Sequence, residues 1–123
     1  MIAPVTGSVL LIDDDPAFRR LARQTLNGSG LTVVGEAATA AAGSAAARSL
    51  EPEIMLVDVG LPDGDGISLA GELSALPWGP RVVLTSVDPD AASPEEVRKS
   101  GAIGFVPKQD LPGSGLDMLM ARI

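Results

Sequence analysis

Short apolar segments recur along the chain, and four of them lead directly into a polar residue. They cover residues 9–12, 54–57, 82–84 and 103–107, and the residues that follow them are Asp13, Asp58, Thr85 and Lys108. Because these segments are short and do not alternate between apolar and polar positions, they predict strands buried on both faces of a parallel sheet. A fifth strand is expected at residues 31–34. Ligands of such sheets bind beyond the carboxyl ends of the strands, so the four polar residues should converge at one edge.

Helical patterns separate the apolar segments. The first begins at Asp15 and Pro16, an expected N-cap and first helical residue, and its apolar positions are Phe18, Leu21, Ala22 and Leu26. Further helices are predicted at residues 39–50, 66–76 and 93–101 and from about Gly113 or Ser114 onward, with Thr39 and Ser93 as caps. Strands that alternate with helices in this way predict a doubly wound α/β domain with right-handed crossovers.

The composition favours one domain and excludes several kinds of chemistry. At 123 residues with 46% apolar content, the chain can bury one core but is too short for two ordinary domains. A net charge of −7 argues against nucleic-acid binding by this segment, and the lack of cysteine and histidine excludes disulfides, thiol chemistry and phosphate storage on a histidine. Residues 1–7 lack the pattern of a secretory signal and are expected to form a flexible leader. No segment is apolar enough to span a bilayer, so we expect a cytoplasmic protein without membrane contact.

Three aspartates define the chemistry expected at the sheet edge. Asp13 and Asp14 follow one strand, and Asp58 follows another. Like charges repel each other when they are crowded, and Mg²⁺ relieves this repulsion because it binds carboxylate oxygens. Asp58 is then the natural nucleophile toward a phosphoryl donor, while Thr85 and Lys108 can contact the transferred group. Each residue taken alone is better explained as solvated or structural, so the prediction depends on the whole set.

This ordered set of motifs resembles the CheY-like receiver domain of bacterial two-component response regulators over residues 8–123. The matching segments are Asp13-Asp14, residues 58–66, Thr85-Ser86 and residues 101–108. The resemblance implies a flavodoxin-like three-layer (βα)5 sandwich with a parallel sheet of strand order 2-1-3-4-5. It also implies that a histidine kinase donates a phosphoryl group to Asp58. Such a domain promotes only its own phosphorylation and dephosphorylation, so we do not expect an enzyme that turns over other substrates.

The resemblance assigns roles to further residues. Asp13, Asp14, Asp58 and the backbone carbonyl of Gly60 would bind Mg²⁺, for which Mn²⁺ can substitute. Thr85 and Lys108 would contact the phosphoryl group. Phe105 occupies the switch position of the family, and core packing is an equal alternative for it. The face formed by about residues 88–123 would repack on phosphorylation and mediate homodimerisation or effector binding.

The chain departs from the family pattern at several positions. Lys108 is followed by Gln109 where receivers commonly carry a proline in a cis peptide, so we expect a trans bond or a rearranged loop. Pro107 has no backbone N–H to donate to a neighbouring strand, which fits a position on an edge strand. A polar residue after the lysine is similar to receivers joined to LuxR-type helix-turn-helix domains, and we expect the chain to be excised from such a DNA-binding regulator. Gly60 and Val87 stand where many receivers carry polar side chains, which predicts slow hydrolysis of the acyl phosphate.

Two other functions are alternatives to a working receiver. A phosphorylation-independent interaction module would keep the fold, but it would usually lack Asp58, an acidic partner or Lys108, and all of these are present. A hydrolase of the haloacid dehalogenase type would need a second acid two residues after its nucleophile, where this chain has Gly60. The interaction module is therefore the main alternative.

Overall fold

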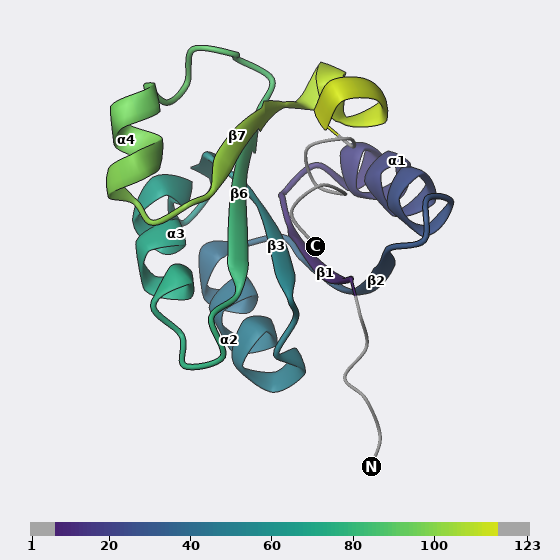
Figure 1. Ribbon diagram of the computed structural model, residues 1–123, viewed down its shortest axis with the longest axis horizontal. Helices are drawn as coiled ribbons and strands as arrows, with labels where there is room; N and C mark the ends of the chain where they lie inside the picture. The colour runs from purple at the N-terminus through teal and green to yellow at the C-terminus, as the bar shows by residue number, and fades with distance from the viewer. Residues whose placement is uncertain (1–6, 116–123) are drawn as a thin grey trace.

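A five-stranded parallel sheet forms the centre of the molecule (Figure 1). The computed structural model describes residues 7–115. The sheet consists of β1 (Ser8–Ile12), β2 (Thr32–Ala37), β3 (Ile54–Asp58), β6 (Arg81–Ser86) and β7 (Gly104–Pro107) in the order β2-β1-β3-β6-β7. Counted without the short hairpin β4 (Gly60–Leu61) and β5 (Gly64–Asp65), this is the predicted order 2-1-3-4-5. The doubly wound α/β prediction is confirmed.

Within residues 7–115, four α-helices begin where cap residues accept hydrogen bonds from the first turn. These helices are α1 (Pro16–Asn27), α2 (Ala40–Leu50), α3 (Gly66–Ser74) and α4 (Pro94–Lys99). The predicted caps Asp15, Thr39 and Ser93 are confirmed, and Ser93 and Glu96 form the full capping box. The cap of α3 is Asp65, which the sequence analysis did not predict as a cap.

Several predicted boundaries differ from the structure, and for two of them the physical reason is identifiable. β2 extends to Ala37 instead of residue 34, because it pairs with the whole of β1 from Ser8 to Ile12 through an irregular register. α3 ends at Ser74 instead of residue 76, because Leu76 precedes Pro77 and a residue before proline disfavours the helical conformation. The chain after β7 forms two short helical turns, η1 (Lys108–Asp110) and η2 (Leu111–Gly115), and most of the last predicted helix lies outside the described residues.

Residues of the strands contribute alternately to two hydrophobic clusters, one on each face of the sheet. In β3, Met55 and Val57 belong to the cluster under α2, α3 and α4, whereas Ile54 and Leu56 belong to the cluster under α1. Figure 1 shows these helices covering opposite faces. The three layers explain why the strand segments are continuously apolar, since both faces are buried.

The first helix fits this arrangement with one exception. Phe18, Ala22 and Leu26 are buried against the sheet, while Leu21 is 46% exposed because it lies at the margin of their stripe. Within residues 7–115 no helix is both long and apolar enough to cross a bilayer. All peptide bonds in that range are trans, and the expected trans bond at Lys108-Gln109 is among them. Pro107 lies on the edge strand β7, as expected.

Candidate functional site

Three carboxylates meet at the carboxyl edge of the sheet. β1 and β3 pair in parallel with Ile12 opposite Val57, so the residues that follow lie side by side. Asp13, Asp14 and Asp58 each offer a carboxylate oxygen, and these oxygens lie within 4.8 Å of one another. Asp13 and Asp58 are buried, whereas Asp14 is exposed at the mouth of the site.

The two carboxylate oxygens of Asp13 have different surroundings. Oδ1 accepts the backbone N–H of Asp15 at 2.9 Å. Oδ2 lies 2.8 Å from Nζ of Lys108, yet it is a buried oxygen that accepts no aligned hydrogen bond from the described residues. The ammonium therefore compensates the charge of this oxygen without filling its directed lone pairs. This free acceptor capacity, in a cluster of oxygen donors only, fits a divalent cation such as Mg²⁺.

Asp58 is held at the end of β3, and its surroundings favour the neutral carboxyl more than water does. Its Oδ1 accepts the backbone N–H of Gly60 at 3.3 Å, and its Oδ2 lies 3.7 Å from Nζ of Lys108. Burial, followed by the charge of Asp13, raises the pKa of the Asp58 carboxyl, while the Lys108 ammonium acts in the opposite direction. Without a cation the cluster is therefore electrostatically crowded.

Lys108 reaches the carboxylates from the turn directly after β7. Its ammonium contacts Asp13 and Asp58 and also lies 4.6 Å from the centroid of the Phe18 ring. A cation over an aromatic face is attracted to the ring electrons. Sequence reasoning assigned Phe18 only to the apolar face of α1, and its spacing carried no signal for this second contact.

Thr85 lies beside Asp58, but its hydroxyl has another partner. The β3–β6 register places the two residues opposite each other, and the backbone N–H of Val59 donates to the Thr85 carbonyl. The buried Oγ1 of Thr85 donates to the carbonyl of Val106 on β7 at 2.6 Å. To donate to a group on Asp58, this hydroxyl must first leave Val106.

Phe105 is half-buried on β7 and packs against the cluster under α4. It borders a groove of about 860 Å³ between α4 and β7, whose lining includes Pro89, Ser93, Val97, Ala102 and Ile103. The groove lies on the face expected to carry the output signal. Residues 116–123 of that predicted face are outside the described residues.

The segment after Asp58 is positioned by contacts that the sequence did not reveal. Gly66 donates its N–H to the Val59 carbonyl, and a Cβ at Gly66 would lie only 2.0 Å from the Asp58 carbonyl oxygen. The Asp63 carboxylate accepts the backbone N–H groups of Ala40 and Ala41 at the start of α2, and these bonds lower the pKa of Asp63. The glycines and Pro62 of this segment favour a loop, but only the fold shows what the loop touches.

The chain matches one protein family and many individual proteins. The model of the response regulator receiver domain matches residues 9–119. A putative transcriptional regulator of Pseudomonas aeruginosa is 36% identical over 105 residues, covering 85% of this chain and 50% of that protein. The nitrate/nitrite response regulator protein NarL of Escherichia coli K12 is 32% identical over 107 residues, covering 86% of this chain and 50% of that protein. The chain thus spans about half the length of the curated relatives it matches.

Solved structures agree with this result. A two-component response regulator of the LuxR family from Aurantimonas sp. SI85-9A1 superimposes with a TM-score of 0.85 at 26% identity, covering 94% of this chain and 83% of that chain. The signal receiver domain of the putative response regulator NarL from Mycobacterium tuberculosis gives a TM-score of 0.79 at 28% identity, with coverage of 97% and 100%.

Proposed function

The chain belongs to the response regulator receiver domain family of two-component signalling, and from that premise we propose that Asp58 accepts the phosphoryl group. The observation that carries this proposal is the meeting of Asp13, Asp14 and Asp58 with the ammonium of Lys108 at one end of the sheet. Asp58 lies within reach of both the acidic pair and the Lys108 ammonium. Its Oδ2 is free of backbone hydrogen bonds within the described residues.

The transfer forms one bond and breaks another. A carboxylate oxygen of Asp58 attacks phosphorus, while the phosphorus–nitrogen bond of a phosphohistidine on a histidine kinase breaks and the imidazole keeps the electron pair. Little proton chemistry is needed, so alignment and neutralisation of charge decide the rate. Lys108 supplies a cation within 3.7 Å of the Asp58 carboxylate. The domain promotes only this self-modification and its reversal.

A divalent cation fits the acidic side of the site. Asp13, Asp14, Asp58 and the backbone carbonyl of Gly60 would hold Mg²⁺, or Mn²⁺ in its place, and the bound ion would neutralise and align the phosphoryl oxygens. Asp13 brings a buried oxygen with free acceptor capacity to this set. Asp14, which is exposed, leaves an open side through which the phosphodonor can approach.

Phosphorylation would reach the output face through Thr85. A phosphoryl group on Asp58 carries roughly two negative charges, which favours donation by the Thr85 hydroxyl over its bond to the neutral Val106 carbonyl. Loss of that bond would loosen the connection between β6 and β7. The face of about residues 88–123, with Phe105 and its groove, would then repack and form a homodimer or an effector interface.

The output is proposed to be transcription, because the relatives are transcriptional regulators of about twice this length. A LuxR-type DNA-binding domain would lie outside these 123 residues, and the regulator would work in the cytoplasm. Within the site, Gly60 and Val87 offer no polar side chain to place an attacking water, and the Val87 side chain is exposed. Slow loss of the phosphoryl group follows from this.

The test is phosphorylation in solution. The chain is incubated with Mg²⁺ and a small phosphodonor such as acetyl phosphate, and the intact mass is followed over time. We expect wild type and Asp90→Asn, an exposed aspartate outside the site, to gain one phosphoryl group, and Asp58→Asn to gain none. A wild-type chain that gains no mass would instead support the phosphorylation-independent interaction module, and fast loss of the group would contradict the slow hydrolysis.

A further inference from the structure

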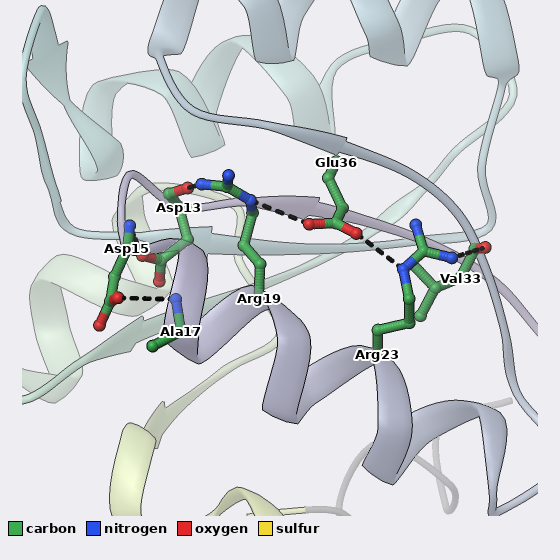
Figure 2. Close-up of polar contacts among 7 residues, drawn as sticks. All are labelled: Asp13, Asp15, Ala17, Arg19, Arg23, Val33 and Glu36. Atoms are coloured by element: carbon green, nitrogen blue, oxygen red, sulfur yellow. Dashed lines mark hydrogen bonds and ion pairs between the residues drawn. The ribbon is translucent and has the colours of Figure 1, made fainter.

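An ion-pair network connects α1 to the edge strand β2 (Figure 2). Arg19 and Arg23 lie one turn apart on α1, and both contact the carboxylate of Glu36. The Nε of Arg19 lies 2.9 Å from Oε1, and the Nε of Arg23 lies 2.7 Å from Oε2. Glu36 thus holds both arginines, one with each oxygen. Neither arginine nor Glu36 belonged to the site predicted from the sequence.

Arg19 also reaches the acidic cluster. Its Nη1 donates to the backbone carbonyl of Asp13, and Figure 2 shows the guanidinium lying between that carbonyl and Glu36. The Arg19 side chain is only 18% exposed, so water competes weakly for this contact. Arg23 has the same charge and the same partner, but its other donor points to the Val33 carbonyl, away from the cluster.

The carbonyl that Arg19 holds belongs to the peptide between the two acidic residues. On the other side of Asp13, its N–H donates to the Ala37 carbonyl of β2 at 2.9 Å. The Asp13 carboxylate in turn accepts the N–H of Asp15. Rotation of the Asp13-Asp14 peptide would break the Arg19 contact. The contact therefore restrains the direction of the Asp14 side chain relative to that of Asp13.

We propose that Arg19, anchored by Glu36, is a positioning residue that orients the Asp13-Asp14 pair for a divalent cation. This inference rests on the proposed Mg²⁺ site. It assigns to Arg19 a role that its charge alone would not predict, because a positive group near the cluster repels the cation. When Arg19 is removed, its charge predicts tighter Mg²⁺ binding, whereas its contact with the Asp13 carbonyl predicts weaker binding. These opposite expectations make the inference testable.

The experiment measures Mg²⁺ affinity by calorimetry on the full chain after treatment with a chelator. Arg19→Met should bind Mg²⁺ about tenfold more weakly than wild type, at the low end of what loss of an outer partner costs a metal site. Arg19→Lys should also bind weakly, because one ammonium cannot reproduce the planar fork that serves both Glu36 and the carbonyl. Arg23→Met removes an equal charge from the same network and should leave the affinity almost unchanged.

A second pair of variants separates positioning from general loss of stability. Glu36→Ala leaves Arg19 in place without its anchor, and it should weaken Mg²⁺ binding by less than Arg19→Met does. The double variant should bind no more weakly than Arg19→Met alone, because both changes act through one contact. Amide NMR spectra without Mg²⁺ verify that each variant is folded, and Glu36→Ala keeps the test decisive if Arg19→Met does not fold.

Three results would overturn the inference in distinguishable ways. Equal or tighter Mg²⁺ binding by Arg19→Met would show that only charge matters, while the Mg²⁺ site itself would stand. Equal losses of Mg²⁺ affinity in Arg19→Met and Arg23→Met would show that the network affects only the stability of the fold and that the Arg19 contact does not position the cluster. Absence of Mg²⁺ binding by the wild-type chain would remove the proposed metal site and this inference together.

Discussion

At Lys108 one ammonium faces two carboxylates and an aromatic ring. It lies 2.8 Å from Asp13, 3.7 Å from Asp58 and 4.6 Å from the centre of the Phe18 ring. The buried Phe18 ring covers one side of the ammonium. The ammonium is therefore directed toward the carboxylates, and its position depends on Phe18.

Replacing the ring should slow phosphorylation. A partly desolvated cation–π contact contributes about 0.5–2 kcal/mol, so Phe18→Leu should take up a phosphoryl group roughly threefold or more slowly. Intact mass recorded over time with a small phosphodonor measures this rate. Phe18→Tyr keeps the ring face and should stay near wild type, and equal rates for Phe18→Leu and wild type would exclude a role for the ring.

The Thr85 hydroxyl is predicted to exchange one acceptor for another. A hydrogen bond to a charged group contributes about 1.5–3 kcal/mol, and one to a neutral carbonyl contributes about 1 kcal/mol. The net gain of about 1 kcal/mol predicts that Thr85→Val binds a phosphoryl mimic such as beryllofluoride about fivefold more weakly. Thr85→Ser keeps the hydroxyl and is the matched control. Equal beryllofluoride affinity for Thr85→Val and wild type would contradict the proposed connection between Asp58 and β7.

Among the elements, the β4–β5 hairpin links the end of β3 to α3 and to α2. It is closed by the pairing of Gly60 with Asp65 and is connected to α2 through the Asp63 carboxylate. Gly66, which follows directly, lies so close to the Asp58 backbone that no side chain fits between them. The position of Asp58 therefore depends on a glycine eight residues later in the chain.

A methyl group at Gly66 should disturb both stability and the site. The Cβ would lie 2.0 Å from the Asp58 carbonyl oxygen and 2.8 Å from the Val59 Cα, so the backbone must move. Overpacking of this kind costs about 1–3 kcal/mol, which chemical denaturation of Gly66→Ala would measure. Gly64→Ala is the control, because its Cβ would meet only the Ala40 Cβ at an ordinary 3.6 Å. Similar stability of the two variants would contradict the close approach.

The contact between α1 and β2 should depend on pH through Glu36. Hydrogen bonding to Arg23, and to a lesser extent to Arg19, lowers the pKa of Glu36 below its ordinary value of 4.5. A carboxyl whose pKa is lower in the folded state stabilises the fold above its ordinary pKa and loses this contribution as the pH falls through the lowered value. The contribution at neutral pH should be below about 1 kcal/mol, because the pairs are partly exposed.

The comparison that isolates this effect is wild type against Glu36→Gln. Their free energies of unfolding should differ most near neutral pH and converge as the pH drops below 4.5. Chemical denaturation at a series of pH values measures the difference, in which contributions of the other titrating groups cancel. A difference that stays constant down to the lowest pH would show that Glu36 acts by packing alone.

For the molecule as a whole, both faces of the sheet bury apolar side chains and the carboxyl edge gathers charge. Within residues 7–115 the buried carboxylates of Asp13 and Asp58 share an ion pair with Lys108, whose ammonium lies nearer to Asp13. The raised pKa of Asp58 reflects this imbalance together with its burial. The edge that is suited to chemistry thus carries more negative than positive charge at close range.

Removal of one charge should therefore stabilise the protein when no cation is present. With a chelator at neutral pH, Asp58→Asn should melt a few degrees above wild type, because it keeps an acceptor for the Gly60 N–H and relieves the repulsion. Asp13→Asn should melt below wild type, because it deprives Lys108 of its closest partner. Addition of Mg²⁺ should raise the melting temperature of wild type more than that of Asp58→Asn. A lower melting temperature for Asp58→Asn in chelator would mean that Lys108 already balances the site.

The sequence by itself determined the layered architecture and the residues gathered at its carboxyl edge. Continuous apolar segments such as residues 54–57 required a sheet buried on both sides, and parallel strands place the residues after them at one edge. The caps Asp15, Thr39 and Ser93 were equally predictable, because a cap bonds to residues within one turn of itself. These features depend on periodicity and on near neighbours, and both are visible in a linear sequence.

Only the tertiary structure decided which atoms these residues contact. The Thr85 hydroxyl donates to Val106, the Lys108 ammonium lies over the Phe18 ring, and Arg19 donates to the Asp13 carbonyl. The positions of these residues in the sequence carry no signal of the pairings. Periodicity tells which face a side chain occupies, but its partner depends on its rotamer and on the packing of the helix that carries it. The residues of the site follow from the order of the chain, and their mutual positioning follows from how α1, β2 and β7 pack around them.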